Sequence, residues 1–128
     1  MALFWTDSIV ICCSNVESAK RWWIETFDCK QAKVPEDWDE HLLSDKALKL
    51  PGADEPTILL NDRNEVKLAG LAVPADRPIL FCHKLEKAYE YLEGKRASPG
   101  PIQETGGTQF FEVRDPEGNV IEICEELD

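Results

Sequence analysis

The sequence is poor in positive charge. Its 128 residues include 14 Lys and Arg against 25 Asp and Glu, which gives a formal net charge of -11 at pH 7. Phosphate binding needs clustered Lys and Arg, so this balance argues against a nucleic-acid partner and against an anionic membrane surface. The same balance permits a cationic ligand, although an acidic composition usually serves solubility alone.

Several other signals are missing. No apolar run approaches the roughly 20 residues of a membrane span, and the opening MALFWTDS lacks the basic region and apolar core of a secretory signal. The five cysteines include no CxxC pair, so we expect reduced thiols in a cytoplasmic protein and no structural zinc site. Without a Ser/His/Asp arrangement or a phosphate-binding glycine loop, hydrolase and kinase functions have no support.

Strand and helix signals are present, and their order occurs twice. In the first half, strands are predicted at 8–13, 29–34, 47–50 and 57–60, with a helix over 16–27. In the second half, we predict strands at 78–82 and 103–104, a helix from 85 to about 94, and a hairpin over 109–124. A lone βαβββ unit would leave one sheet face uncovered, so two units are expected to share a core. The fold class is therefore α+β, in one domain with module 1 at about 1–63 and module 2 at about 77–128.

The first helix and the closing hairpin have the clearest local signals. Ser14 with Glu17 matches a capping box, which predicts the start of the helix. Asp115-Pro116-Glu117-Gly118 has the residue preferences of a type I turn. In the arm after this turn, Ile121 and Ile123 share one face, whereas Val120, Glu122 and Cys124 share the other. A carboxylate between two apolar neighbours either meets water or has a function, and the pattern leaves both readings open.

Three stretches together resemble a known superfamily. Ile9 to Phe27 resembles its opening strand and helix start, with Asn15 where Asp is usual. Leu80 to Leu92 resembles its second strand and helix, and Phe111 to Ile123 resembles its closing D-P-(D/E)-G-N-x-(I/L)-E hairpin. The group is the vicinal-oxygen-chelate superfamily, which includes glyoxalase I, extradiol dioxygenases, fosfomycin resistance enzymes and bleomycin resistance proteins. The resemblance implies paired βαβββ modules that form curved mixed sheets around a cavity, often in a homodimer. A ferredoxin-like sandwich is the alternative fold.

The resemblance also implies a metal site with one ligand from each of four strands. Glu122 matches the closing ligand, but the other positions fall on Ser8, on Arg77 or Pro78, and on Leu59 to Asn61, which include no His or acid. Asn61 or Asp62 adds an oxygen only if its strand is longer than predicted. His41 and His83 fit no ligand position: we expect His41 in a solvated loop and His83 capping the second helix. No metal cofactor is therefore predicted, and a divalent metal is the alternative.

The leading functional hypothesis is a binding module for a small organic molecule, cationic or aromatic, in a cavity without the usual metal. The expected ligand-binding residues are Glu122, Ser8, Cys12, Arg77, Phe81, Phe110 and Trp38, and Trp5 and Trp22 are further aromatics that could stack on a planar ligand. Cys12 and Cys124 are expected to be unreactive thiols of the cavity wall. The alternatives are a metal-dependent lyase, isomerase or dioxygenase with unusual ligands, a metal-free enzyme that uses Glu122 as acid or base, and a subunit with a vestigial cavity.

Overall fold

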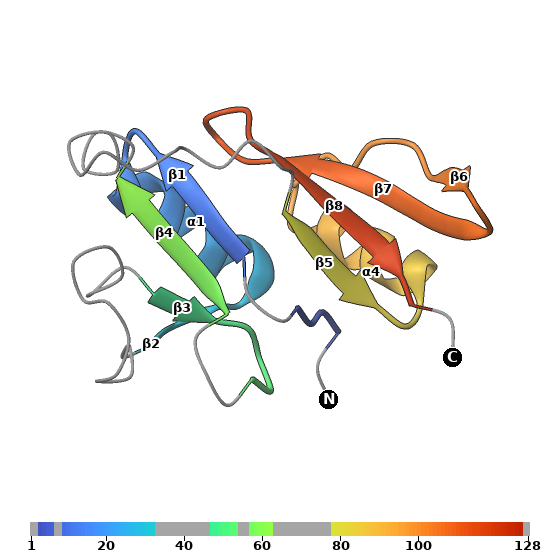
Figure 1. The fold of residues 1–128 in the computed structure, drawn as a ribbon, viewed down its shortest axis with the longest axis horizontal. Helices are drawn as coiled ribbons and strands as arrows, with labels where there is room; N and C mark the ends of the chain where they lie inside the picture. Colours follow the sequence, from blue (N-terminus) through green and yellow to red (C-terminus); the bar gives the residue numbers. More distant parts are fainter. Residues whose placement is uncertain (1–2, 7–8, 33–46, 54–56, 63–77, 127–128) are drawn as a thin grey trace.

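The computed structural model describes residues 3–6, 9–32, 47–53, 57–62 and 78–126 (Figure 1). The first half contains β1 (Ile9–Cys13), α1 (Val16–Phe27), β2 (Lys30–Ala32), β3 (Ala47–Lys49) and β4 (Ile58–Asp62). The second half contains β5 (Ile79–Cys82), α4 (Leu85–Gly94), β6 (Gln103–Thr105), β7 (Thr108–Arg114) and β8 (Val120–Glu125). The predicted elements are all present, with ends shifted by a few residues. The expected module boundaries near 63 and 77 lie outside the described residues.

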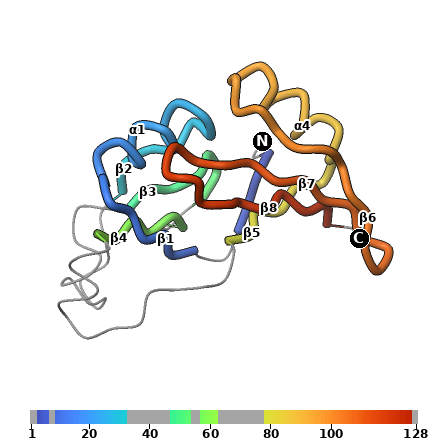
Figure 2. The backbone as a smooth tube through the Cα atoms, turned by 90° about the horizontal axis from the view of Figure 1, so that it is seen from above, coloured from blue at the N-terminus to red at the C-terminus, as the bar shows by residue number. Residues whose placement is uncertain are grey.

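The two halves have the same topology. The first sheet has the strand order β1-β4-β3-β2 and the second has β5-β8-β7-β6. In each sheet the first and last strands of the module pair in parallel, and the other neighbours are antiparallel. The two helices lie on the same side of the molecule, each against one face of its own sheet (Figures 1 and 2). The opposite sheet faces are therefore left for other contacts.

The core forms where each helix meets its sheet. On α1 the helical spacing buries Ala19, Trp23 and Phe27, because these positions recur on one side of the helix. On α4 the buried positions are Leu85, Ala88 and Leu92. The strand residues that meet the helices alternate with half-buried or exposed ones, as in Phe111, Val113, Ile121 and Ile123, which are all 0% or 1% exposed. Cys13 and Cys82 are part of this core.

The N-terminal residues connect the two modules. Trp5 pairs with Phe81 of β5 through two main-chain hydrogen bonds of 2.9 and 2.8 Å. Thr6 Oγ1 donates a hydrogen bond to the Ile79 carbonyl at 3.0 Å. The ring of Phe4 packs edge-on against Phe27 of α1 at 5.1 Å, and it also contacts Tyr91 of α4 at 5.8 Å. This segment therefore contacts both helices and the free edge of β5.

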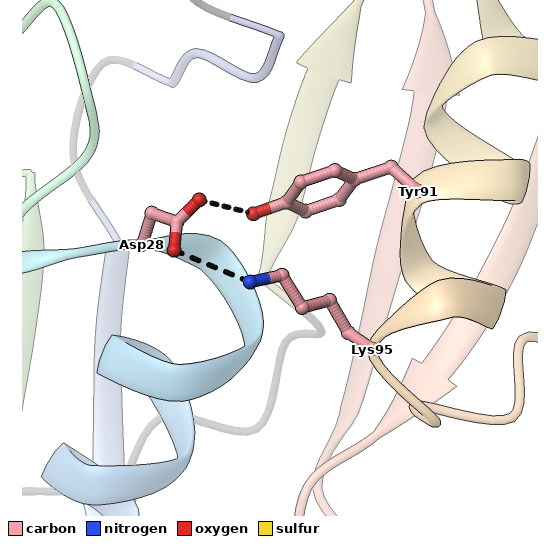
Figure 3. A network of polar contacts seen from close by, with 3 residues as sticks. All are labelled: Asp28, Tyr91 and Lys95. Atoms are coloured by element: carbon pink, nitrogen blue, oxygen red, sulfur yellow. Dashed lines mark hydrogen bonds and ion pairs between the residues drawn. The ribbon is translucent and has the colours of Figure 1, made fainter.

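Polar contacts join the modules at both ends of α1. Asp28, just after α1, accepts hydrogen bonds from Tyr91 Oη at 2.6 Å and from Lys95 Nζ at 3.4 Å (Figure 3). At the other end, the Glu117 carboxylate accepts the main-chain N–H groups of Ser14 at 2.7 Å and Asn15 at 3.1 Å. The tip of the β7–β8 hairpin thus satisfies amides at the N-terminus of the first helix.

Three local predictions were wrong. The cap of α1 is Asn15, whose side chain accepts the Ser18 N–H at 3.0 Å, instead of Ser14 in a capping box. The residue before α4 is Lys84, without a side-chain cap, and the Leu85 N–H donates to Glu125, so His83 does not cap this helix. β4 extends through Asn61 and Asp62, which were predicted to end it, because both pair with β1.

Candidate functional site

Glu122 lies on the face of the second sheet that points away from α4. Its strand neighbours Ile121 and Ile123 are fully buried under the helix, whereas Val120, Glu122 and Cys124 are half-buried. The alternation predicted from the sequence is therefore confirmed. The Glu122 N–H donates to the Pro78 carbonyl at 3.0 Å, which fixes the backbone beside β5. The carboxylate is presented from the middle of a strand paired on both sides.

A second carboxylate stands directly across from Glu122. The antiparallel register of β7 and β8 pairs Glu112 with Glu122, and Ile79 of β5 lies on the other side. Like charges at directly opposite positions of a sheet repel each other, so this arrangement favours a positive group near the pair. Glu112 was not among the residues predicted from the sequence. The alternation of β7, in which Phe111 and Val113 are buried, could have placed it on the same face.

Aromatic rings lie beside the carboxylate pair. Phe81 of β5 and Phe110 of β7 are both in register with Cys124, one on each side of β8. Trp5 stacks on Phe81 with ring centroids 4.8 Å apart and an interplanar angle of 27°. We name this surface the acidic-aromatic face, defined by Glu112, Glu122, Phe81, Phe110 and Trp5. It combines carboxylates with π faces, which is the chemistry that recognises organic cations.

The remaining predicted residues lie in other elements or fall outside the described part. Cys12 is in the first sheet, paired with Asn61 and only 7% exposed, and nothing in the strand register joins it to Glu122. Trp22 is on α1, where its ring packs against Trp23 and Phe27. The predicted residues Ser8, Arg77, Trp38 and His41 lie outside the described residues.

The cysteine thiols of the second sheet are held protonated. The pKa of Cys124 is raised, first by burial and then by the negative charge of Glu122. Burial, aided by the Glu125 and Cys124 charges, raises the pKa of Cys82 to about 12. A thiol needs a lowered pKa to act as a nucleophile near neutral pH. The raised pKa of Cys124 therefore supports the expectation that its thiol is unreactive.

The described residues do not fit the metal site that the resemblance implies. Within the described ranges, no three His, Cys, Asp or Glu side chains lie close enough to hold an ion. Pro78 has no ligating side chain, and its carbonyl already accepts the Glu122 N–H. The longer β4 adds Asn61 and Asp62, but successive strand residues point to opposite faces, so at most one of them shares a face with Cys12.

None of the helices in the described segments is long and apolar enough to cross a membrane.

Comparisons with known proteins identify the fold. No protein-family model matches the sequence, and no curated protein matches it. Solved structures do match. A glyoxalase/bleomycin resistance protein/dioxygenase superfamily member from Sphaerobacter thermophilus superposes with a TM-score of 0.69 at 18% identity, over 95% of this chain and 97% of that one. TioX from Micromonospora sp. ML1 gives 0.62 at 15% identity, over 96% and 97%. Lactoylglutathione lyase from Agrobacterium tumefaciens gives 0.62 at 12% identity, over 92% and 90%. The chain therefore has the fold of the glyoxalase/bleomycin resistance/dioxygenase superfamily, with two mixed four-stranded sheets and a helix against each, as the sequence predicts.

Proposed function

We propose that this protein binds a small organic molecule with a cationic group, and that the acidic-aromatic face is its binding surface. The observation that carries the proposal is the cross-strand pair of Glu112 and Glu122. A positive group next to both carboxylates relieves their mutual repulsion. Charge interactions at half-buried positions are stronger than in bulk water, because the surroundings polarise less.

The rings beside the carboxylates supply the second half of the recognition. Trp5 and Phe81 already stack on each other, so their orientation is set before a ligand arrives. Phe110 lies on the far side of Cys124 from Phe81. A planar cation can contact a ring face and Glu122 at the same time, which favours aromatic ammonium or iminium compounds over small inorganic cations.

A titration with 1-methylquinolinium tests the proposal. This probe is planar and permanently cationic, and quinoline is its uncharged counterpart at neutral pH. We expect saturable binding of 1-methylquinolinium by isothermal titration calorimetry. Replacement of Glu122 by Gln should weaken it roughly tenfold, because a charge-assisted contact becomes a neutral one. Quinoline should bind more weakly and should not respond to Glu122→Gln.

The matched control is Glu104→Gln. Glu104 is an exposed residue of β6 in the same sheet, so this change removes the same charge away from the proposed surface. An equal loss in both variants would mean that the probe responds only to the net charge of the protein, and the proposal would fail. It would also fail without saturable binding. Stoichiometric zinc, iron, manganese or nickel in untagged protein, lost in Glu122→Ala, would favour a metal-dependent lyase, isomerase or dioxygenase.

A further inference from the structure

A cavity lies between α1, the connection from α4 to β6 and the end of β7. Its volume is about 530 Å³, within the range of small-molecule sites. Trp22 of α1 forms one wall, the connection from α4 to β6 forms another with Arg96 and Ser98, and the end of β7 contributes Glu112 and Arg114. Glu112 also belongs to the acidic-aromatic face, whereas Glu122 and the rings of that face do not line the cavity. We call this space the arginine cleft.

The charged side chains of the arginine cleft differ in whether they have partners. Within the described parts of the chain, no carboxylate forms a recorded ion pair with Arg96 or Arg114. Asp115 also lines the cleft, but Oδ1 accepts the N–H groups of Glu117 and Asn119, and Oδ2 accepts Asn119 Nδ2. Among the described residues, Arg96 and Arg114 thus have no carboxylate in an ion pair, although the chain has 25 acidic residues.

The backbone holds Arg96 in a conformation that favours glycine. The Arg96 N–H donates to the Glu93 carbonyl and the Ala97 N–H to the Leu92 carbonyl, both at 3.0 Å, which is the Schellman pattern at a helix end. In this pattern the residue at the position of Arg96 is usually Gly, and Arg96 has a φ of 62°. Ser98, two residues later, also has a positive φ, of 52°. Local strain of this kind gathers at functional sites.

The connection is also tied to its surroundings. The Gly100 N–H donates to the Glu112 carbonyl at 2.9 Å, which joins the loop to β7. Tyr89 Oη donates to the Pro99 carbonyl at 3.3 Å, which joins it to α4. The wall that carries Arg96 is therefore anchored on both sides, and a ligand would meet a largely preformed site.

We propose that the arginine cleft binds a small organic anion whose carboxylate or phosphate meets Arg96 and Arg114 and whose planar part contacts Trp22. A guanidinium group presents N–H donors in a planar fork that matches these oxyanions, and it carries its charge at any physiological pH. The half-buried indole of Trp22 offers an apolar face beside the two charges. This site shares Glu112 with the acidic-aromatic face but takes ligands of opposite charge, because Arg96 and Arg114 line it and Glu122 does not.

Calorimetric titration with 1-naphthyl phosphate, 1-naphthoate and neutral 1-naphthol tests the proposal. Both anions should bind saturably and 1-naphthol should bind much more weakly, and the stronger anion identifies the preferred headgroup. The informative variant is Arg96→Gly, because glycine adopts the observed backbone without strain. We expect roughly tenfold weaker binding of the anions, from the loss of a charged hydrogen bond. The melting temperature should be equal or higher, since the strain is removed.

Arg114→Gln should weaken anion binding similarly, and Arg21→Gln is the matched control. Arg21 is an exposed residue of α1 next to Trp22 but does not line the cleft, so its loss changes the net charge alone. Glu122→Gln should leave anion binding unchanged, which separates this inference from the proposed function. Failure of both anions to bind, or an equal loss in Arg21→Gln and Arg96→Gly, would overturn the proposal.

Discussion

Two charged residues occupy left-handed positions where each helix ends. Asp28 has a φ of 55° after α1, and Arg96 has a φ of 62° after α4. A residue other than glycine in this region costs of the order of 1 kcal/mol. At Asp28 the hydrogen bonds from Tyr91 and Lys95 offset that cost (Figure 3). In the described structure, the Arg96 side chain makes no comparable contact. It lines the arginine cleft instead.

The Asp28–Tyr91 contact predicts a pH-dependent contribution to stability. The Tyr91 hydrogen bond is the main cause that lowers the pKa of Asp28 from its ordinary 3.8. The pKa of Tyr91 is raised from 10.0, first by burial and then by Asp28. A lowered acid pKa adds stability above pH 3.8 that is lost as the pH falls through the folded value. A raised tyrosine pKa adds stability below pH 10.0 that is lost as the pH rises through the folded value.

Tyr91→Phe should therefore destabilise the protein most between these limits. We expect a loss of about 0.5–1 kcal/mol at pH 7, a small value because solvent screens the exposed Asp28 carboxylate. The loss should shrink towards pH 2.5 when urea unfolding is measured across the acid range. Tyr89→Phe is the control. It removes a hydrogen bond to the Pro99 carbonyl, which does not titrate, so the loss of stability in this variant should stay constant over the acid range. A constant loss in Tyr91→Phe would contradict the coupling.

The bounds of the secondary-structure elements were easier to predict from local sequence than their caps. The bounds of α1 were predicted correctly, and α4 ends at Gly94 as expected, because both helices have an apolar stripe at helical spacing. The cap of α1 was misassigned because Ser14 and Asn15 are both good capping residues, and the local pattern cannot rank them. The acceptor that satisfies Ser14 is Glu117, which is 103 residues away in sequence.

The candidate site was predictable only in part, for the same reason. The alternation of β8 placed Glu122 on the face away from the helix, but Glu112 became its neighbour only through strand register. The arginine cleft was missed because Arg96, just after α4, stands where the Schellman pattern usually has Gly, so no residue type marked it. Local patterns therefore predict which face a residue occupies better than which distant residue lies beside it.

The Glu117 carboxylate links the β7–β8 hairpin to the start of α1. Glu117→Ala should destabilise the protein by about 1 kcal/mol, because two amides at the start of α1 lose an anionic acceptor. Glu117→Gln keeps an oxygen but loses the charge, so we expect a smaller loss. Urea unfolding measures both. Glu104→Ala is the control, and a change within about 0.3 kcal/mol is expected at this exposed strand position. Equal losses at Glu117 and Glu104 would exclude the long-range cap.

We propose that the protein forms a homodimer that buries the face of the first sheet opposite α1, so that the acidic-aromatic face stays accessible. Val10 projects from β1 on the face away from α1 and is 38% exposed. Light scattering should give twice the chain mass of 14.5 kDa. Val10→Lys should shift the protein towards monomer, because a charge in an apolar interface is costly. Ile24→Lys on the outer side of α1, also 38% exposed, should not. A monomeric wild type at high micromolar concentration would contradict the dimer.

The pairing of the N-terminal residues with β5 has a consequence for the order of assembly. Thr6 and Ile79 are 73 residues apart in sequence, so Thr6 leaves the ribosome long before its partner exists. Contacts of high sequence separation form late, because the intervening chain must first be ordered. Until they form, β5 is an unprotected strand edge, and such edges are templates for intermolecular pairing. Trp5 and Thr6 thus complete the edge of a sheet that is synthesised long after them.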